Sequence, residues 1–171
     1  MTGLIKRLDT IEFRKLIWLL AITETIHNLE EAVWLPAWSA TAGVWHPPVG
    51  VFEFRFAVTI VTMICYGVIY LYYRSGNKLM TYILAGTLAL ILINIIIPHM
   101  AATLSLRQYV PGVISGLLLN APVTLYLLRR GFREGIFSTR MLLFGTLGFA
   151  IVMVPLLPVL MRAGKFIGGM L

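Results

Sequence analysis

The sequence predicts an all-α, polytopic membrane protein that folds as a bundle of five transmembrane helices. Of its 171 residues, 59% are hydrophobic and only 12% are charged, whereas about 25% of the residues of a soluble domain are charged. The mean hydropathy is +0.89. A helix needs roughly 20 mainly apolar residues to cross a bilayer. Five stretches qualify: Leu16–Trp38, Phe54–Tyr73, Met80–Leu104, Val110–Arg129 and Thr139–Met161.

The first fifteen residues differ from the rest of the chain. Apolar residues recur there at helical spacing, with charged residues between them. This pattern predicts a short amphipathic helix on the membrane surface; a frayed tail is the alternative. The segment is too charged for the core of a signal peptide. We therefore expect an amphipathic segment, residues 1–15, followed by a single transmembrane domain, residues 16–171.

The basic residues predict the orientation. The net charge of +7 does not indicate a nucleic-acid partner, because the basic residues lie in short loops beside apolar runs. Cytoplasmic loops of membrane proteins are enriched in Lys and Arg. In a five-span topology, ten of the 14 basic residues share the side of the N-terminus. We therefore expect a cytoplasmic N-terminus, an external C-terminus and a multi-pass protein of the cell (inner) membrane.

The first predicted span carries an unusual set of ionisable residues: Glu24, His27, Glu30 and Glu31. Residues three or four apart are neighbours on a helix surface, so all four side chains fall in one sector about 120° wide. A carboxylate within the bilayer costs several kcal/mol unless it is compensated. Either the segment is not embedded, or the charge is neutralised by a metal ion, by protonation or by a basic residue such as Arg55.

Further polar residues are expected at the same depth. Asn94 and His99 lie late in the third span, with Pro98 between them. A proline inside a helix kinks it, so we expect a kink there and place Asn94 and His99 in a pocket. Tyr109 precedes the fourth span and belongs either to this pocket or to an interfacial aromatic belt. His46 is expected to be a loop residue.

These residues carry a resemblance to a known family. His27-Asn28-Leu29-Glu30-Glu31 reads H-x-x-E-E, and His99 and then Tyr109-Val110-Pro111-Gly112, which reads Y-x-P-G, follow it. This order resembles the HXXEE domain family of small bacterial and archaeal membrane proteins, over roughly Leu16 to Arg130. The resemblance implies an integral membrane protein of a prokaryote. It implies no substrate, because the family has no assigned biochemical function.

The leading hypothesis for function is a metal-dependent membrane enzyme. Imidazole and carboxylate ligands suit Zn²⁺, Fe²⁺ or Mn²⁺, and His27, Glu31 and His99 are the expected ligands. Glu30 or Glu24 would act as the general base on bound water. The further residues expected to bind the cofactor or substrate are Asn94, Tyr109 and Arg55.

The apolar surroundings indicate a membrane lipid or another hydrophobic small molecule as the substrate. Two alternatives need no catalytic metal. Buried Glu and His side chains could move a proton on an unsaturated lipid, as in an isomerase or cyclase of lipids or isoprenoids. The chain could instead be a carrier or binding protein for a cation or a small molecule. Glycine pairs four residues apart would also allow a homo-oligomer.

Overall fold

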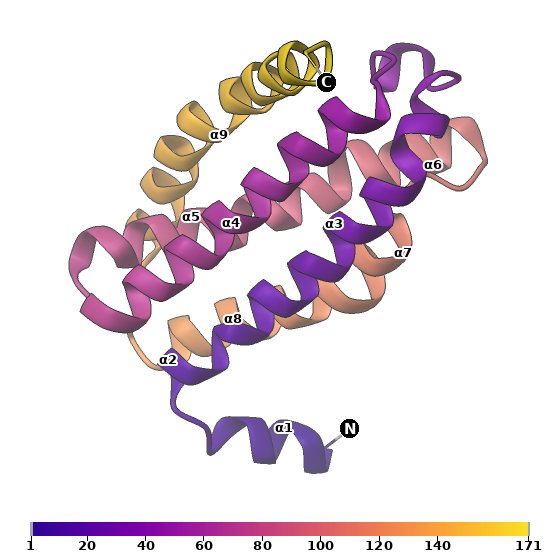
Figure 1. Cartoon of the computed structure of the whole chain (residues 1–171). Coiled ribbons are helices and arrows are strands. Elements are labelled where there is room, and N and C mark those ends of the chain that lie inside the picture. Colours follow the sequence, from indigo (N-terminus) through magenta and orange to yellow (C-terminus); the bar gives the residue numbers. More distant parts are fainter. Residues whose placement is uncertain (1, 171) are drawn as a thin grey trace.

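Helices account for all the regular structure in the computed structural model, which describes residues 2–170 except the side chains of Thr2 and Leu4. The all-α prediction is therefore confirmed for these residues. Three long helices, α3 (Trp18–Ser39), α4 (Val51–Ser75) and α5 (Lys78–Asn94), form the centre of the molecule (Figure 1). Helix α4 packs against both α3 and α5.

Local signals set the tight connection between α4 and α5. Gly76 ends α4 with a φ of 55°, a left-handed conformation that glycine adopts readily. The side chain of Asn77 then accepts a hydrogen bond of 2.9 Å from the backbone N–H of Met80 and caps the start of α5. Such a cap satisfies one of the free N–H groups at a helix start.

The third predicted span has the expected kink. The π-helical segment η2 (Ile95–Met100) and then α6 (Ala101–Leu106) follow α5. Ile97 has φ −131° and ψ 115°, which is an extended conformation within the helical run. A proline disfavours the helical conformation of the residue before it, so Pro98 explains the break. The break leaves Ile96 and Ile97 exposed, while Ile95 and His99 are buried.

The fourth predicted span consists of three short pieces, α7 (Val113–Ser115), the π-helical η3 (Gly116–Asn120) and α8 (Ala121–Arg133). Gly112 precedes them with a φ of 91°. Residues other than glycine rarely adopt this backbone conformation. The two π-helical segments, η2 and η3, contact each other. Such π-helical turns occur frequently at functional sites.

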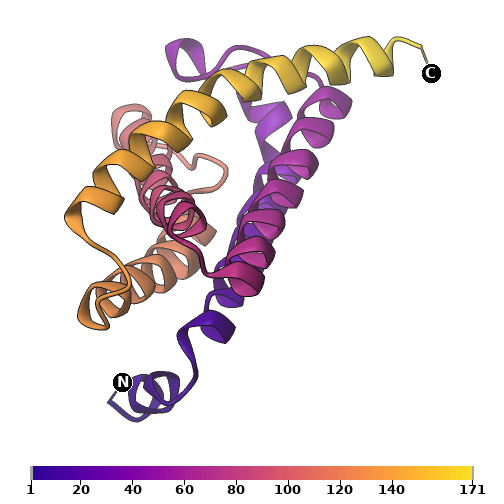
Figure 2. The same ribbon diagram turned by 90° about the vertical axis from the view of Figure 1, so that its left-hand side faces the viewer.

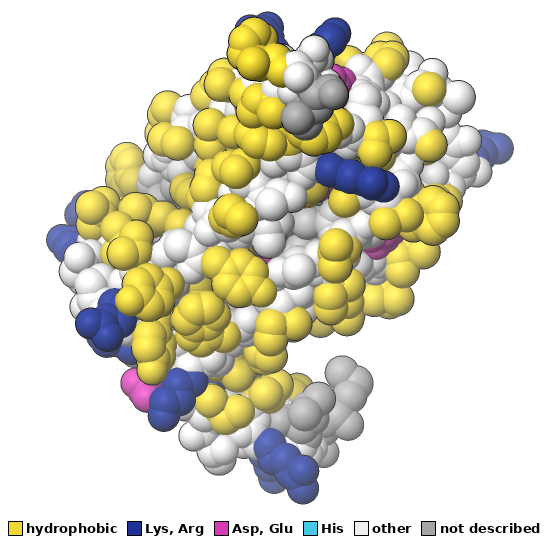
Figure 3. Space-filling model, in the orientation of Figure 1, with side chains coloured by type: hydrophobic (Ala, Val, Ile, Leu, Met, Phe, Trp, Pro, Cys, Tyr) yellow, Lys and Arg dark blue, Asp and Glu magenta, His cyan; other side chains and the backbone are white. Residues whose placement is uncertain are grey.

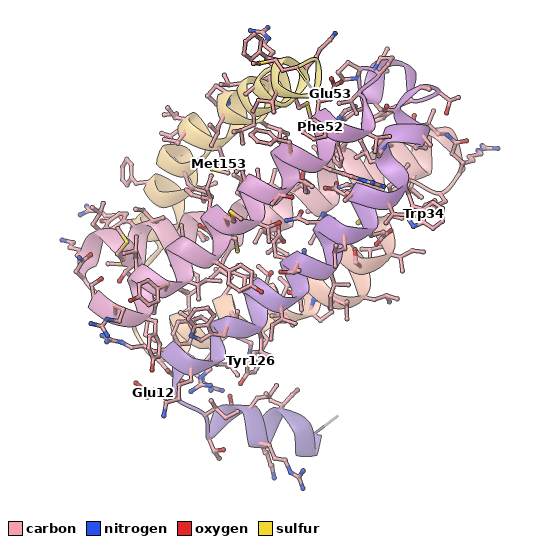
Figure 4. The ribbon with its side chains drawn as sticks, viewed as in Figure 1. Glu12, Trp34, Phe52, Glu53, Tyr126 and Met153 are labelled. Atoms are coloured by element: carbon pink, nitrogen blue, oxygen red, sulfur yellow. The ribbon has the colours of Figure 1, made fainter. Side chains whose placement is uncertain are left out.

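The last helix, α9 (Thr139–Gly168), crosses the outside of the bundle and leans away from α8 (Figure 2). It touches α5 where Gly145 meets the backbone of Gly86. Near its other end, Gly164 and Gly168 lie against the start of α4, at Glu53 and Phe52 respectively, which Figure 4 labels. This glycine pair therefore serves a contact within the chain.

Three helical stretches are long and apolar enough to cross a membrane: Val51–Ser75, Lys78–Leu106 and Thr139–Gly168. In Thr139–Gly168 only 6% of the most apolar window is buried, and hydrophobic side chains cover much of the face in Figure 3. Helix α3 and the residues from Val113 to Arg133 coincide with the other two predicted spans, but α3 carries three glutamates and Val113–Arg133 is divided into short pieces.

The N-terminal segment is helical and docked. Helix α1 (Thr2–Asp9) lies apart at one end of the bundle (Figure 1), and α2 (Phe13–Leu16) leads into α3. The carboxylate of Asp9 accepts a hydrogen bond of 2.8 Å from the hydroxyl of Tyr126, labelled in Figure 4. The guanidinium of Arg130 donates to two backbone carbonyls of the N-terminal segment, at 2.9 and 2.6 Å. Helix α8 thus anchors this segment.

Candidate metal centre

The polar stripe of α3 faces the interior of the bundle. His27 is 1% exposed and Glu24 is 9% exposed. The side chain of Glu31 is 13% exposed, and no histidine is visible on the face shown in Figure 3. Helical periodicity alone placed these side chains on one face, and the packing of α3 against η3 and α7 buries that face.

Two histidines and one glutamate meet in this interior. Oε1 of Glu31 lies 3.1 Å from Nε2 of His99 and 3.8 Å from Nε2 of His27. The two imidazole rings pack edge to face, with their centroids 5.0 Å apart and their planes at 88°. One ligand atom from each of the three residues lies within 4.8 Å of the other two. We call these residues the triad.

The triad could hold a metal ion. A tetrahedral or octahedral ion with bonds of about 2.0–2.2 Å separates neighbouring ligand atoms by roughly 3.0–3.6 Å. The contact between Glu31 and His99 already has this length, and a small rotation of His27 would bring its nitrogen into range. Nε2 of His27 is buried and has no hydrogen-bond partner among the described residues. Such a nitrogen is well suited to a metal.

Two polar side chains support the imidazoles. Oγ of Ser115 lies 3.1 Å from Nδ1 of His27, and a hydrogen bond at one ring nitrogen fixes the role of the other. Nδ2 of Asn94 lies 3.1 Å from Nε2 of His99, the nitrogen that also faces Glu31. That nitrogen either donates to the carboxylate or accepts from the amide.

The first glutamate of the H-x-x-E-E stretch, Glu30, has other partners. One carboxylate oxygen of Glu30 accepts hydrogen bonds from the hydroxyl of Tyr109, at 2.6 Å, and from the backbone N–H of Gly112, at 3.0 Å. The other oxygen accepts from the backbone N–H of Ser115 at 2.8 Å. These three donors saturate the carboxylate and tie the loop before α7 to α3.

Glu24 lies about one helical turn before His27 on α3. Its Oε2 accepts a hydrogen bond of 2.7 Å from Nδ2 of Asn120, in η3. Asn120 is completely buried. Asn120 is the one hydrogen-bond partner of the Glu24 side chain among the described residues.

A cavity of about 400 Å³ opens beside the triad, within the size range of small-molecule sites. Glu24, Glu31 and His99 line it, whereas Glu30 does not. Apolar side chains of α4, α5 and α9 form most of the remaining wall; Met153 of α9, labelled in Figure 4, is one of them. The residues after α3 also contribute, namely Trp38, Trp45 and His46.

Comparison with known proteins agrees with the pattern of these residues. A family model described as "Protein of unknown function with HXXEE motif" matches residues 18–127. The chain belongs to the HXXEE family. A curated relative, the uncharacterized protein YrkK of Bacillus subtilis (strain 168), is 36% identical over 141 residues, which are 82% of this chain and 89% of the relative. No solved structure shows a significant match to the chain.

The part that matches the HXXEE family contains the whole triad, Glu24, Glu30 and the loop before α7, and it ends before α9. The last helix therefore adds a wall of the cavity from outside the matched residues. Phe149, Met153, Val154 and Leu157 supply this wall.

The structure does not bring every expected residue to the site of this HXXEE protein. Nε of Arg55 donates a hydrogen bond of 3.0 Å to the backbone carbonyl of Ala32, and Arg55 does not line the cavity. The expectation that Arg55 neutralises the acidic stripe therefore has no support in the structure, because the exposed guanidinium bonds to the α3 backbone instead. Asn94 lines the cavity, whereas Tyr109 does not. The hydroxyl of Tyr109 donates to Glu30, which also lies outside the cavity.

Sequence reasoning missed some contributors. Ser115 and Asn120 lie on π-helical or short helical pieces whose inward face no simple periodicity gives. The loop residue His46 lines the cavity, while its Nδ1 lies 2.6 Å from the carbonyl oxygen of Pro47. The one signal for Asn120 was an amide within an apolar span, where polar side chains are costly.

Proposed function

We propose that the protein is a metal-dependent membrane enzyme that acts on a hydrophobic substrate. The observation that carries the proposal is the triad at the edge of an apolar cavity: two imidazoles and one carboxylate meet beside a space of about 400 Å³. Two histidines and one carboxylate leave coordination positions open in catalytic zinc sites and in non-haem iron sites. Substrate or water would occupy those positions.

In this proposal Glu24 is the general base. It lines the cavity, is nine-tenths buried and leaves one carboxylate oxygen free of the hydrogen bond to Asn120. Glu30 lies outside the cavity and is saturated by three donors. We therefore assign Glu30 a positioning role.

Elemental analysis of the protein purified in detergent tests the metal. The expected result is near-stoichiometric Zn, Fe or Mn in the native chain and its loss from His27→Ala and His99→Ala. His46→Ala is the matched control, because it removes a cavity-lining imidazole that is not part of the triad. Metal that persists in both triad variants, or a native chain without metal after loading, would refute the proposal.

A second candidate, metal-free proton transfer on an unsaturated lipid, has one supporting observation. Glu24 faces the cavity and is bonded to Asn120, not to the triad. A native chain that binds no metal yet isomerises a lipid, with activity abolished in Glu24→Gln, would favour this candidate.

We further propose that all five helical stretches cross the cell membrane, with the N-terminus in the cytoplasm. The excess of basic residues on the side of the N-terminus supports this orientation. Burial of the polar face of α3 also removes the obstacle to embedding it. Labelling of single cysteines in a Cys65→Ser background tests it: an impermeant reagent should reach position 44 from outside and position 77 only after permeabilisation. The reverse pattern would exclude this topology.

A further inference from the structure

The charged groups that line the cavity are unusually one-sided. Glu24 and Glu31 both line it, and no Lys or Arg does among the described residues. Arg55, on the neighbouring helix α4, bonds to the backbone of α3 instead. Apart from Glu24, Glu31 and His99, the lining has neutral polar side chains, namely two amides, a threonine and two tryptophans, together with His46. A metal on the triad would compensate Glu31 and leave Glu24 without a counter-charge.

The carboxylate of Glu24 has a single hydrogen-bond donor among the described residues. Asn120 supplies one hydrogen bond to Oε2. The amide oxygen of Asn120 is itself buried and has no partner among the described residues. The neighbouring wall, including Cys65 and Ile91, is apolar. Asn120 does not line the cavity, whereas Glu24 does. Oε1 of Glu24 has no hydrogen-bond donor among the described residues, so a ligand in the cavity that brings a donor would satisfy this oxygen.

We propose that the cavity takes a molecule with an apolar chain whose polar end is a hydrogen-bond donor, an amine or a hydroxyl group, and that this end binds at Glu24. Anionic amphiphiles are disfavoured, because a second negative charge would lie beside a buried carboxylate with no Lys or Arg in the described lining, and like charges in contact repel. The inference rests on the proposed function for the cavity and names its substrate class. It also suits Glu24 as a base, since a general base must reach the proton that it accepts.

Tryptophan fluorescence provides a direct test. Trp38 and Trp45 line the cavity, whereas Trp34 is 57% exposed and points away from the bundle (Figure 4). Two variants would be reconstituted into phosphatidylcholine vesicles with a chelator: one retains Trp38 and Trp45, the other retains only Trp34, and phenylalanine replaces the remaining tryptophans. The probes are ω-brominated dodecylamine, dodecanol and dodecanesulfonate, because bromine quenches tryptophan at short range.

For each probe, we compare the quenching of Trp38 and Trp45 in the first variant with the quenching of Trp34 in the second. This ratio corrects for the partition of each probe into the bilayer. We expect this ratio to be roughly tenfold or more higher for the amine and the alcohol than for the sulfonate. Glu24→Gln should reduce the preference for the amine over the sulfonate at least about fivefold. The same substitution at Glu53, which does not line the cavity, should leave it unchanged.

Equal or stronger cavity quenching by the sulfonate would overturn the inference, as would a preference that survives in Glu24→Gln. The chelator keeps this test independent of the metal. Failure of the charge preference with a stoichiometric metal would therefore remove only the substrate class. Absence of metal with an intact charge preference would remove only the metal enzyme.

Discussion

Replacement of Gly112 by alanine should damage the candidate metal centre directly. An added Cβ would lie 2.5 Å from Cε1 of His99 and 2.9 Å from Cε1 of His27, so it would press on both imidazoles at once. Gly112 also has a φ of 91°, which is unfavourable for an L residue by roughly 1–2 kcal/mol. Overpacking of a buried site adds about 1–3 kcal/mol. We expect a total of roughly 2–5 kcal/mol.

Gly116 provides the matched control for this prediction. It belongs to the same segment, has a helical φ of −57°, and its added Cβ would approach Ile95 at 3.3 Å and His27 at 3.6 Å. Its replacement by alanine also gains about 0.5–1 kcal/mol of helix preference, so the net change should stay within about 1 kcal/mol.

Thermal unfolding in detergent measures the change in stability. Competition with a chromogenic zinc chelator measures the change in metal affinity. Gly112→Ala should weaken metal binding roughly 10- to 100-fold, the range for a displaced ligand shell, and lower the melting temperature. Gly116→Ala should do neither to a comparable extent. If Gly112→Ala binds metal with native affinity and melts at the native temperature, the imidazoles do not depend on this glycine and the proposed geometry is refuted.

Three further predictions concern the surroundings of the site. Tyr109→Phe removes the hydrogen bond to Glu30 and should lower the free energy of unfolding, measured by chemical denaturation, by roughly 1 kcal/mol. An unchanged free energy of unfolding would contradict a stabilising role for this hydrogen bond. Hydrogen bonds, first from Arg133 and then from a tyrosine, lower the pKa of Asp9 below its ordinary 3.8. Docking of α1 should therefore be strongest above about pH 4 and weaken as pH falls through the lowered pKa, as faster proteolysis of α1 would show. Arg133→Gln should weaken docking at neutral pH, while the bonds from Arg130 to the backbone of the N-terminal segment remain. Gly145→Leu should separate α9 from the backbone of α5. It should raise the accessibility of a single cysteine introduced into α5 in a Cys65→Ser background; unchanged accessibility would contradict the close crossing.

The local features of this fold could be predicted from the sequence. The helical stretches agree with the apolar runs, because a helix in lipid must satisfy all of its backbone groups internally. The stripe on α3 follows from a fixed period of 3.6 residues. The kink at Pro98 follows from the missing N–H and the ring of proline. Each of these inferences uses residues close together in the chain.

The partners of these residues could not be predicted in the same way. The approach of Asn120 to Glu24 spans 96 positions, and it depends on how η3 faces α3. A π-helical turn shifts the register of the helix, so a regular helical projection gives the wrong face there. The close passage of α9 over α5 depends on Gly86 and Gly145, which lie in different helices and form no recognisable pair in the sequence. For Arg55, charge suggested an acidic partner, whereas the structure gives a backbone carbonyl.

The two adjacent glutamates of the H-x-x-E-E stretch serve different neighbours, and this difference explains why Y-x-P-G accompanies them. Successive residues on a helix point about 100° apart, so Glu31 can face the imidazoles while Glu30 faces the loop before α7. Gly112 donates to Glu30 and leaves the space that both imidazoles fill. Gly112 therefore links the position of the loop to the packing of the triad. A variant that frees the loop should loosen the triad even when its three ligands are intact.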